Sequence, residues 1–332
     1  MTTVDGTTKG QGETSNLKNQ LTFYEVSQSW LAKRKSRIKK SSYIRYGYAL
    51  DKQIVPALGC FLIREITAEH FEEFSETKLL AGRLDGTGGL APQTVTGFLI
   101  IIKSIMRYAE REGYSGEVPS IEYPSSYNKE IRVLSKWEQK KLERILHRNM
   151  DLPALGVMLS LYSGLRLGEV CALKWKDICL PDRTLKVHKT IQRIKNTEGG
   201  KTRTKVIIDK PKSKKSIRDI PLPKFMAELL REYIGNDENY ILSGMPFQAL
   251  DMRTIQYRFK YYLTKANIVD ANFHSLRHTF ATRCVEADVD IKTLSEMLGH
   301  SSVKITMDLY VHPTMDQKRR CVDKLAKFMS VS

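Results

Sequence analysis

A segment rich in glycine and proline at residues 113–134 limits most strongly how this chain can fold. Its two glycines and two prolines are interspersed with Ser and Asn, and such a composition interrupts both helices and strands. A chain of 332 residues is long enough for about two domains. We therefore expect a disordered tail over residues 1–20, a helical domain over 21–114, a linker over 115–134 and a second domain over 135–332.

The first domain is expected to be helical because its apolar residues recur at helical spacing. Phe23, Val26 and Trp30 fall on one helical face. A second apolar face begins at Val95, shortly after Pro92, a residue that suits the first turn of a helix. Basic residues gather where the first two helices meet and on the last helix. The candidates for DNA contact are Arg34, Lys35, Lys39, Lys40, Arg45 and Lys103.

The second domain is expected to combine helices with a small sheet. Ser135 and Glu138 fit a capping box at the start of a helix. Three segments with basic turns between them have the pattern of strands, over residues 184–194, 204–209 and 217–222. The pattern is helical again from Pro223, and a tail helix is expected over about 314–332. The predicted fold class is therefore mainly α with a small antiparallel β-sheet.

The charge balance points to a polyanionic partner. The chain has 54 Lys and Arg against 37 Asp and Glu, a formal net charge of +17, which makes nucleic acid the default partner. Its longest apolar run, Phe98–Ile102, is far shorter than a membrane span. Five scattered cysteines favour neither a disulfide framework nor a thiolate zinc site. We expect a cytoplasmic protein that acts at the nucleoid and has no membrane partner.

Four short segments carry residues suited to phosphate chemistry. They are Ser163–Glu169 (SGLRLGE), Lys212–Leu222 (KSKKSIRDIPL), His274–His278 (HSLRH) and Leu298–Ser302 (LGHSS), which Tyr310 follows.

Cleavage of a phosphodiester builds up charge on the non-bridging oxygens, and arginine binds these oxygens in a bidentate manner without losing its proton. Arg166 and Arg277 are candidates because each lies beside leucine rather than in a run of charges. His274 and His300 can move protons near neutral pH, and the hydroxyl of Tyr310 can attack phosphorus. A lysine of the basic turn can protonate the 5′-oxygen that leaves.

Each of these residues also has a purely structural explanation. Arg166 alone could be an ion-pair partner of Glu169, and Tyr310 could be a core aromatic residue. His274 and His278 at i and i+4 could bind a metal, but the glutamate of an HExxH zinc motif is absent. The motifs of P-loop NTPases, dinucleotide-binding domains and α/β-hydrolases are absent as well.

The order of the four segments resembles that of the tyrosine recombinase (integrase) family. The stretches GLRLGE, HSLRHTFAT and LGHSSVKITMDLY are similar to the family's two sequence boxes almost letter for letter, and the resemblance extends over about residues 20–330. It implies a helical core-binding (SAM-like) domain and an α+β catalytic domain, which form a C-shaped clamp around duplex DNA. It also implies a site-specific DNA recombinase, either an integrase or excisionase of a phage or mobile element or a resolvase. Such an enzyme works through a 3′-phosphotyrosyl intermediate and a Holliday junction.

The resemblance also assigns roles to individual residues. It makes Tyr310 the nucleophile, Glu169 the residue that supports the first arginine, and His278 structural. It implies no cofactor and no metal. The implied partners are a double-stranded recombination site, a homotetramer of two synapsed dimers, and accessory DNA-bending or excision factors. The implied catalytic residues are Arg166, Lys212, His274, Arg277, His300 and Tyr310.

Two other functions stay open on the residues alone. A type IB topoisomerase shares this chemistry but acts as a monomer, and a transcriptional regulator would bind DNA without cutting it. Val322, Leu325 and Met329 lie at i, i+3 and i+7 of the expected tail helix. In recombinases such an apolar stripe docks on a neighbouring subunit, which favours the recombinase over the topoisomerase. The intact set of catalytic residues argues against the regulator.

Overall fold

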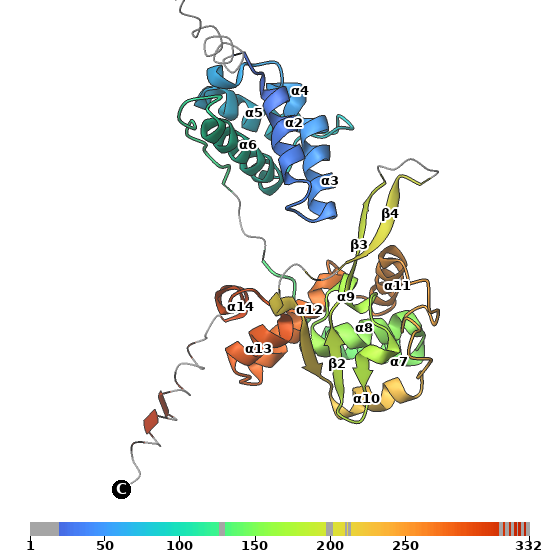
Figure 1. Cartoon of the computed structure of the whole chain (residues 1–332). Coiled ribbons are helices and arrows are strands. Elements are labelled where there is room, and N and C mark those ends of the chain that lie inside the picture. The colour runs from blue at the N-terminus through green and yellow to red at the C-terminus, as the bar shows by residue number, and fades with distance from the viewer. Residues whose placement is uncertain are drawn as a thin grey trace, which may run out of the picture. The chain divides into compact units, whose positions relative to one another are not determined.

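A computed structural model describes residues 20–125, 130–196, 202–209, 211 and 214–311, together with seven single residues beyond 311. The expected disordered tail, apart from Gln20, and the candidate catalytic Lys212 lie outside the described residues. The chain forms two compact units, Met1–Lys129 and Glu130–Ser332, so their boundary falls inside the expected linker. Both units are drawn in Figure 1, and each has its own hydrophobic core.

The first unit is helical in the part that the structure describes. Its elements are α2 (Phe23–Arg34), α3 (Lys40–Ala49), the π-helical turn η1 (Leu50–Ile54), α4 (Val55–Leu58), the 3₁₀ turn η2 (Ile63–Glu65), α5 (Ala68–Ala81) and α6 (Pro92–Glu112).

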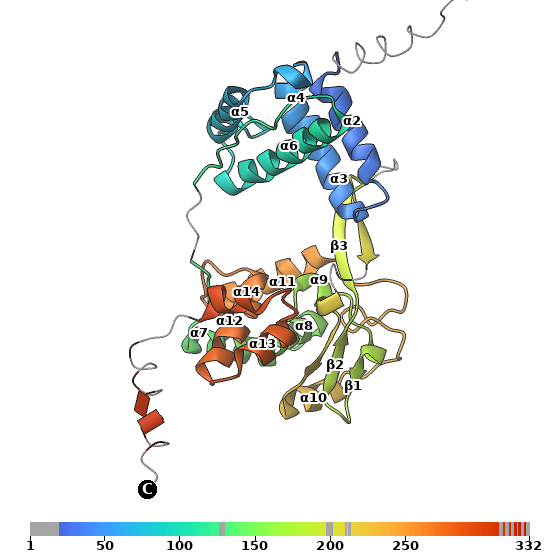
Figure 2. The same cartoon turned by 60° about the vertical axis from the view of Figure 1, so that its left-hand side comes forward.

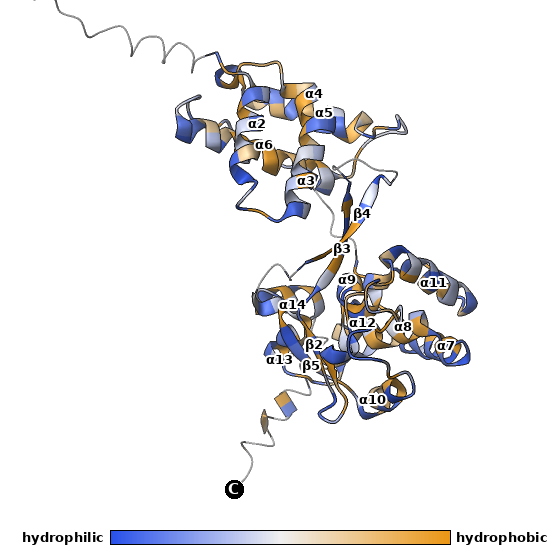
Figure 3. Cartoon of the chain, turned by 45° about the vertical axis from the view of Figure 1, so that its right-hand side comes forward, coloured by the Kyte–Doolittle hydropathy of each residue, from blue (hydrophilic) through white to orange (hydrophobic). Residues whose placement is uncertain are grey.

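Local sequence signals set the ends of these helices. Helix α2 starts at a capping box, in which the side chains of Thr22 and Glu25 each accept the other residue's backbone N–H. Helix α6 has Pro92 in its first turn and ends at Gly113, whose φ of 73° favours a residue without a Cβ. Hydrophobic positions, orange in Figure 3, line α2 and α6, and the two helices pack against each other.

The second unit combines helices and short strands. Its helices are α7 (Lys136–Arg148), α8 (Leu152–Ser163), α9 (Leu167–Val170), η3 (Trp175–Asp177), η4 (Lys214–Ser216), α10 (Lys224–Arg231), α11 (Met252–Lys265), α12 (Phe273–Glu286), α13 (Ile291–Leu298) and α14 (Val303–Tyr310). Helix α8 packs against α7, α11 and α12, and its residues are buried along nearly its whole length. It is therefore the central element of this unit (Figure 2).

The described strands form two antiparallel sheets rather than the one sheet that we expected. Strands β1 (Ile178–Cys179), β2 (Thr184–Val187) and β5 (Arg218–Pro221) pair in the order β1-β2-β5, and β3 (Thr190–Lys195) pairs with β4 (Thr204–Asp209). The predicted single strand over residues 184–194 is therefore wrong. Pairing of β2 with β5 ends at Val187 and Arg218, so the chain after Val187 has no partner in that sheet and pairs with β4 instead. The expected mainly α fold with antiparallel strands is otherwise confirmed.

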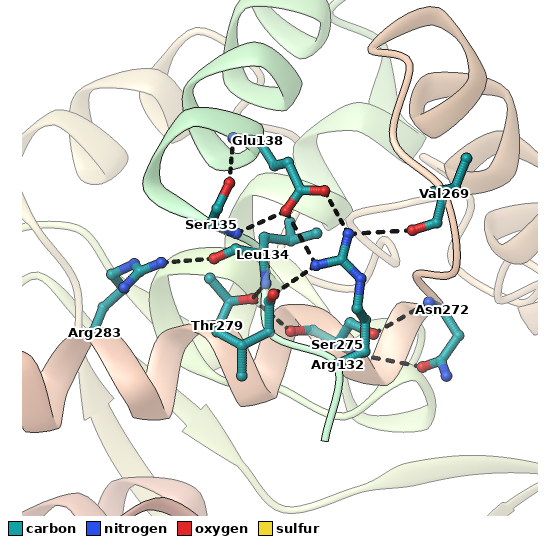
Figure 4. Close-up of polar contacts among 10 residues, drawn as sticks. Arg132, Leu134, Ser135, Glu138, Val269, Asn272, Ser275, Thr279 and Arg283 are labelled. Carbon is teal, nitrogen blue, oxygen red and sulfur yellow. Dashed lines mark hydrogen bonds and ion pairs between the residues drawn. The ribbon is translucent and has the colours of Figure 1, made fainter. Parts of the chain in front are cut away.

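Leu134, close to the start of the second unit, is hydrogen-bonded to α12 through its backbone, as Figure 4 shows. The backbone N–H of Leu134 donates to the Thr279 hydroxyl at 2.9 Å, and the Leu134 carbonyl accepts from Arg283 at 2.6 Å. Just before them, Arg132 forms an ion pair with Glu138 in the first turn of α7. The segment that enters this unit thus links α7 to α12, the helix that carries three of the residues singled out above.

A buried ion pair connects three elements of the second unit. Glu169 in α9 is 3% exposed, and Arg218 in β5 is 9% exposed. The two side chains form a bidentate pair with N···O distances of 2.9 and 3.1 Å, and Nε of Arg218 donates to the Met297 carbonyl of α13 at 2.6 Å. Buried charges must be paired to be tolerated. Helix α9, strand β5 and the end of α13 are therefore held in one arrangement.

We expect Arg218→Ala to lower the free energy of unfolding of the second unit by about 2–4 kcal/mol, because its removal leaves the buried Glu169 charge only partly compensated. Urea titration read by hydrogen exchange in peptides of residues 136–311 measures this, since a chain of two units need not unfold in one transition. Arg231→Ala on the exposed end of α10 is the matched control and should change the free energy by less than about 0.5 kcal/mol. Equal losses in the two variants would contradict a structural role of the pair.

Candidate active site

The candidate site lies where the end of α8, α9, α12, α13 and α14 meet. Helix α12 starts at Asn272, whose side chain accepts the backbone N–H groups of His274 and Ser275. From this start, His274, Arg277 and His278 follow at i, i+3 and i+4 and share one helical face. The structure brings together six of the seven residues that the resemblance assigns: Arg166, Glu169, His274, Arg277, His300 and Tyr310. The seventh is Lys212.

Arg277 is the anchor of the site. Its side chain is 1% exposed, and its guanidinium donates to the Gly164 carbonyl at 2.9 Å and to the Leu298 carbonyl at 2.7 Å. Burial, followed by the charge of Arg166, lowers the pKa of Arg277 to about 9, so the group stays charged at neutral pH. Because a guanidinium has five N–H donors, two carbonyl contacts fix its plane and leave donors for an anion.

Arg166 is the more accessible arginine, with a side chain that is 36% exposed. Its Nη1 lies 2.8 Å from Oε1 of Glu169. Burial raises the pKa of Glu169, but the hydrogen bonds and charge of Arg218 and the charge of Arg166 outweigh this effect and lower it to about 2. Glu169 is therefore an ionised carboxylate that pairs with both Arg166 and Arg218. Arg166 does form an ion pair with Glu169, and this pair does not prevent Arg166 from binding a phosphate as well.

Arg218 is a residue of this site that the sequence analysis missed. It lies on the same face of β5 as the buried Ile220. An arginine on the core side of a strand requires a buried acidic partner. The alternation of buried and exposed residues along β5 was therefore the signal that could have identified Arg218. Arg218 thus positions Arg166 through Glu169, which both arginines contact.

Tyr310 is the last residue of α14 and is 7% exposed. Its hydroxyl lies 2.8 Å from Nδ1 of His278. Burial raises its pKa, and the charges of Arg277 and Arg166 and a hydrogen bond with Arg277 oppose the rise. The phenol is therefore protonated at neutral pH and lies within the field of both arginines.

Two histidines of the site, His278 and His300, lie next to this tyrosine, the third, His274, contacts His278, and all three are neutral at pH 7. The ring of His300 stacks parallel to that of Tyr310, with centroids 6.4 Å apart, and its Nδ1 lies 2.8 Å from the Thr306 hydroxyl. Burial and the nearby arginines lower the pKa of His274, and that of His300 to about 4. His278, to which a structural role was assigned, contacts both Tyr310 and the ring of His274, whose centroid is 4.6 Å away.

The candidate DNA contacts of the first unit are partly engaged within that unit. Arg34 donates to the Ser104 hydroxyl of α6 at 2.8 Å and lies over the Trp30 ring at 4.6 Å. Lys103, the neighbour of Ser104, lies 5.7 Å from the centre of the Tyr123 ring. The end of α2 and the middle of α6 are thus side by side. The remaining candidates lie beyond Arg34 and in α3; Lys35, Lys40 and Arg45 are exposed and Lys39 is half-buried.

Most of the expected tail helix falls outside the described residues. The structure does describe the three residues of the predicted apolar stripe, and they are exposed: Val322 at 64%, Leu325 at 56% and Met329 at 72%. Within the described ranges, no three His, Cys, Asp or Glu side chains gather closely enough to hold a metal ion. The helices of those ranges are also too short or too polar to cross a membrane.

Comparison with known proteins gives family matches for both units. The phage integrase family matches residues 127–317, and the N-terminal SAM-like domain of phage integrases matches residues 22–79. A XerC-like tyrosine recombinase of Caldanaerobacter subterraneus is 31% identical over 262 residues, which are 71% of this chain and 66% of that protein.

Solved structures share the fold. The Tn1549 transposon integrase in complex with a circular intermediate DNA has a TM-score of 0.73 at 19% identity, over 92% of this chain and 99% of that one. A lambda integrase tetramer bound to a Holliday junction has a TM-score of 0.62 at 18% identity, over 93% and 84% of the two chains. The expected SAM-like domain and catalytic domain are confirmed by these matches.

The match to the phage integrase family covers more than half of the chain and includes all six described candidate residues of the site. It favours the recombinase over the topoisomerase and the non-catalytic regulator. The chain therefore belongs to the phage integrase family of tyrosine recombinases, which are DNA strand-transferring enzymes.

Proposed function

We propose that this recombinase cuts and rejoins duplex DNA at a specific site through a covalent bond between Tyr310 and a 3′-phosphate, as the integrase or excisionase of a mobile element or as a resolvase. The observation that carries the proposal is the position of Tyr310, whose buried hydroxyl lies within the field of Arg166 and Arg277. A tyrosine that only filled the core would not need two guanidinium groups around its polar end.

The chemistry follows from the charges in the site. Arg166 and Arg277 bind the non-bridging oxygens of the scissile phosphate, where negative charge increases in the transition state. The Tyr310 oxygen forms a bond to phosphorus, and the bond from phosphorus to the 5′-oxygen breaks. Lys212 gives this oxygen its proton, and neutral His274 and His300 donate hydrogen bonds to the phosphate oxygens. The energy of the broken bond is kept in the phosphotyrosine, so rejoining needs no nucleotide cofactor.

The assembly that we propose is a homotetramer of two synapsed dimers on a double-stranded recombination site, in the cytosol. The lambda integrase tetramer on a Holliday junction has the same fold and supports this arrangement, and the complex of the transposon integrase with DNA supports a mobile element as the source. Arg34, Lys35, Lys39, Lys40, Arg45 and Lys103 are the proposed DNA contacts of the first unit. Accessory DNA-bending or excision factors complete the proposed set of partners.

The nucleophile is tested with Tyr310→Phe. This variant should bind DNA as the wild type does and form no covalent protein–DNA adduct on a nicked suicide duplex, because phenylalanine has no hydroxyl to attack phosphorus. The adduct is measured by denaturing gel electrophoresis. An adduct of undiminished yield would move the nucleophile to another residue. Tyr257 and Tyr261, which are 73% and 42% exposed, would then be tested before the fully buried Tyr262.

The role of Lys212 is tested with a substrate whose bridging 5′-oxygen is replaced by sulfur. Lys212→Ala should cleave ordinary DNA about 10²–10⁴-fold more slowly, because it lacks the general acid, and should recover on the sulfur substrate, whose leaving group needs no proton. Arg166→Ala should not recover, since its task is charge stabilisation. Recovery of Lys210→Ala or Lys214→Ala instead would move the role to that lysine, and a persistent defect of Lys212→Ala would make it a phosphate ligand.

The assembly is tested by deletion of residues 318–332. The truncated chain should bind a single site nearly as well as the full chain and lose at least about tenfold in cooperativity, since burial of each apolar side chain of the tail is worth roughly 1.5–3 kcal/mol. The double variant Leu325→Asp, Met329→Asp should have the same effect, and Asp323→Asn should have none. Gel-shift titration on one-site and two-site duplexes measures the difference. Unchanged recombination by the truncated chain, still as a tetramer, would show that the tail packs on its own subunit or is dispensable.

A further inference from the structure

His278 is the described residue whose position the proposed reaction does not yet explain. Of the three histidines around Tyr310, it is the one for which a ring nitrogen lies within hydrogen-bond distance of the hydroxyl, 2.8 Å from it. The residue comes from α12 and Tyr310 from the end of α14, so the contact joins two elements of the site. A contact of this length to a candidate nucleophile is one of the features that identify a general base.

The other two histidines are placed differently. The His300 ring lies parallel to that of Tyr310, with an angle of 5° between the planes, and its Nδ1 is engaged with the Thr306 hydroxyl at 2.8 Å. The His274 ring stands at 90° to that of His278 and contacts Tyr310 through no hydrogen bond among the described residues. Neither is placed to receive the phenolic proton directly.

We propose that His278 is the general base of strand cleavage, and that its Nδ1 accepts the phenolic proton of Tyr310 as the tyrosine oxygen attacks phosphorus. This inference rests on the proposed function, in which Tyr310 is the nucleophile. His278 is then a catalytic residue in its own right, because it touches a reacting atom.

Before DNA binds, the two groups are in the protonation states from which this transfer starts, although the pKa shifts themselves oppose it. Burial, and then the charges of His274 and Arg277, lower the pKa of His278 to about 4, while burial raises the pKa of Tyr310. At neutral pH the phenol thus has a proton to donate, and the neutral imidazole has one nitrogen that can accept it. The groups that act on His278 are His274 and Arg277 from α12 and Tyr310 from α14. A bound phosphodiester adds a negative charge among them, which raises the basicity of His278 when DNA is in place.

The protons balance over the whole reaction. In cleavage, the bond between the Tyr310 oxygen and phosphorus forms while the bond to the 5′-oxygen breaks. One proton moves from Tyr310 to His278, and one moves from Lys212 to the 5′-oxygen. In rejoining, the attacking 5′-hydroxyl returns its proton to Lys212, and the imidazolium of His278 protonates the leaving tyrosine. The site therefore returns to its initial state without an external acid or base.

The test compares His278→Ala with His278→Asn in the full-length protein, by the single-turnover rate of adduct formation on a nicked suicide duplex. Asparagine places a hydrogen-bonding amide close to the Nδ1 position but cannot take up a proton. Both variants should bind DNA normally and cleave about 10²–10³-fold more slowly. Added imidazole should restore much of the rate to the alanine variant. His147→Ala, on the exposed face of α7, is the matched control and should cleave at the wild-type rate.

The sulfur-bridged substrate separates this role from that of the general acid. His278→Ala should stay slow on it, because the tyrosine must still lose its proton, whereas Lys212→Ala recovers. A wild-type rate for His278→Asn would reduce His278 to a residue that only orients Tyr310, and a wild-type rate for His278→Ala would remove it from the reaction. Either result would overturn the inference. An adduct with Tyr310→Phe would instead overturn the proposed function itself, so the two failures can be told apart.

Discussion

The second unit depends on the ion pairs that the buried carboxylate of Glu169 forms with two arginines. The carboxylate is shared by Arg218, which is buried, and Arg166, which is half-exposed. One charge thus compensates the buried Arg218 and orients Arg166, the proposed phosphate ligand. Because Arg218 also binds the end of α13, the position of Arg166 is coupled to the turn that carries His300. The arrangement of the site is therefore a consequence of how a buried charge is neutralised.

A second buried cation explains the spacing of the sequence motifs. The guanidinium of Arg277 binds the carbonyl of Gly164, at the end of α8, and that of Leu298, at the end of α13. The C-terminal ends of helices carry partial negative charge on their free carbonyls, so both of these ends can face the same arginine. The segments around Arg166 and His300, which are far apart in the sequence, meet because each follows one of these helix ends.

Local signals predicted the helices well, since caps and proline act over a few residues: Ser135 opens α7 and Pro92 opens α6, as the sequence indicates. The motifs also predicted which residues gather in the site. The division of residues 184–194 between two sheets depends on where β5 begins, which is a tertiary property. The partnership of Arg218 with Glu169 spans 49 positions, and the contact of His278 with Tyr310 spans 32. Periodicity within a segment can show that Arg218 is buried, but it does not show which distant residue is its partner.

The two glycines that end α8 and α13 restrict how the protein can change. Gly164 and Gly299 both have a φ of 65°, and a Cβ would lie 2.7 Å from Phe280 at the first and 3.0 Å from Arg218 at the second. A side chain there would strain the backbone and also press on Phe280 at the first position and on Arg218 at the second. The first unit has a separate core. Substitutions on its surface do not alter the packing around Gly164 and Gly299, where any other residue would be strained and crowded.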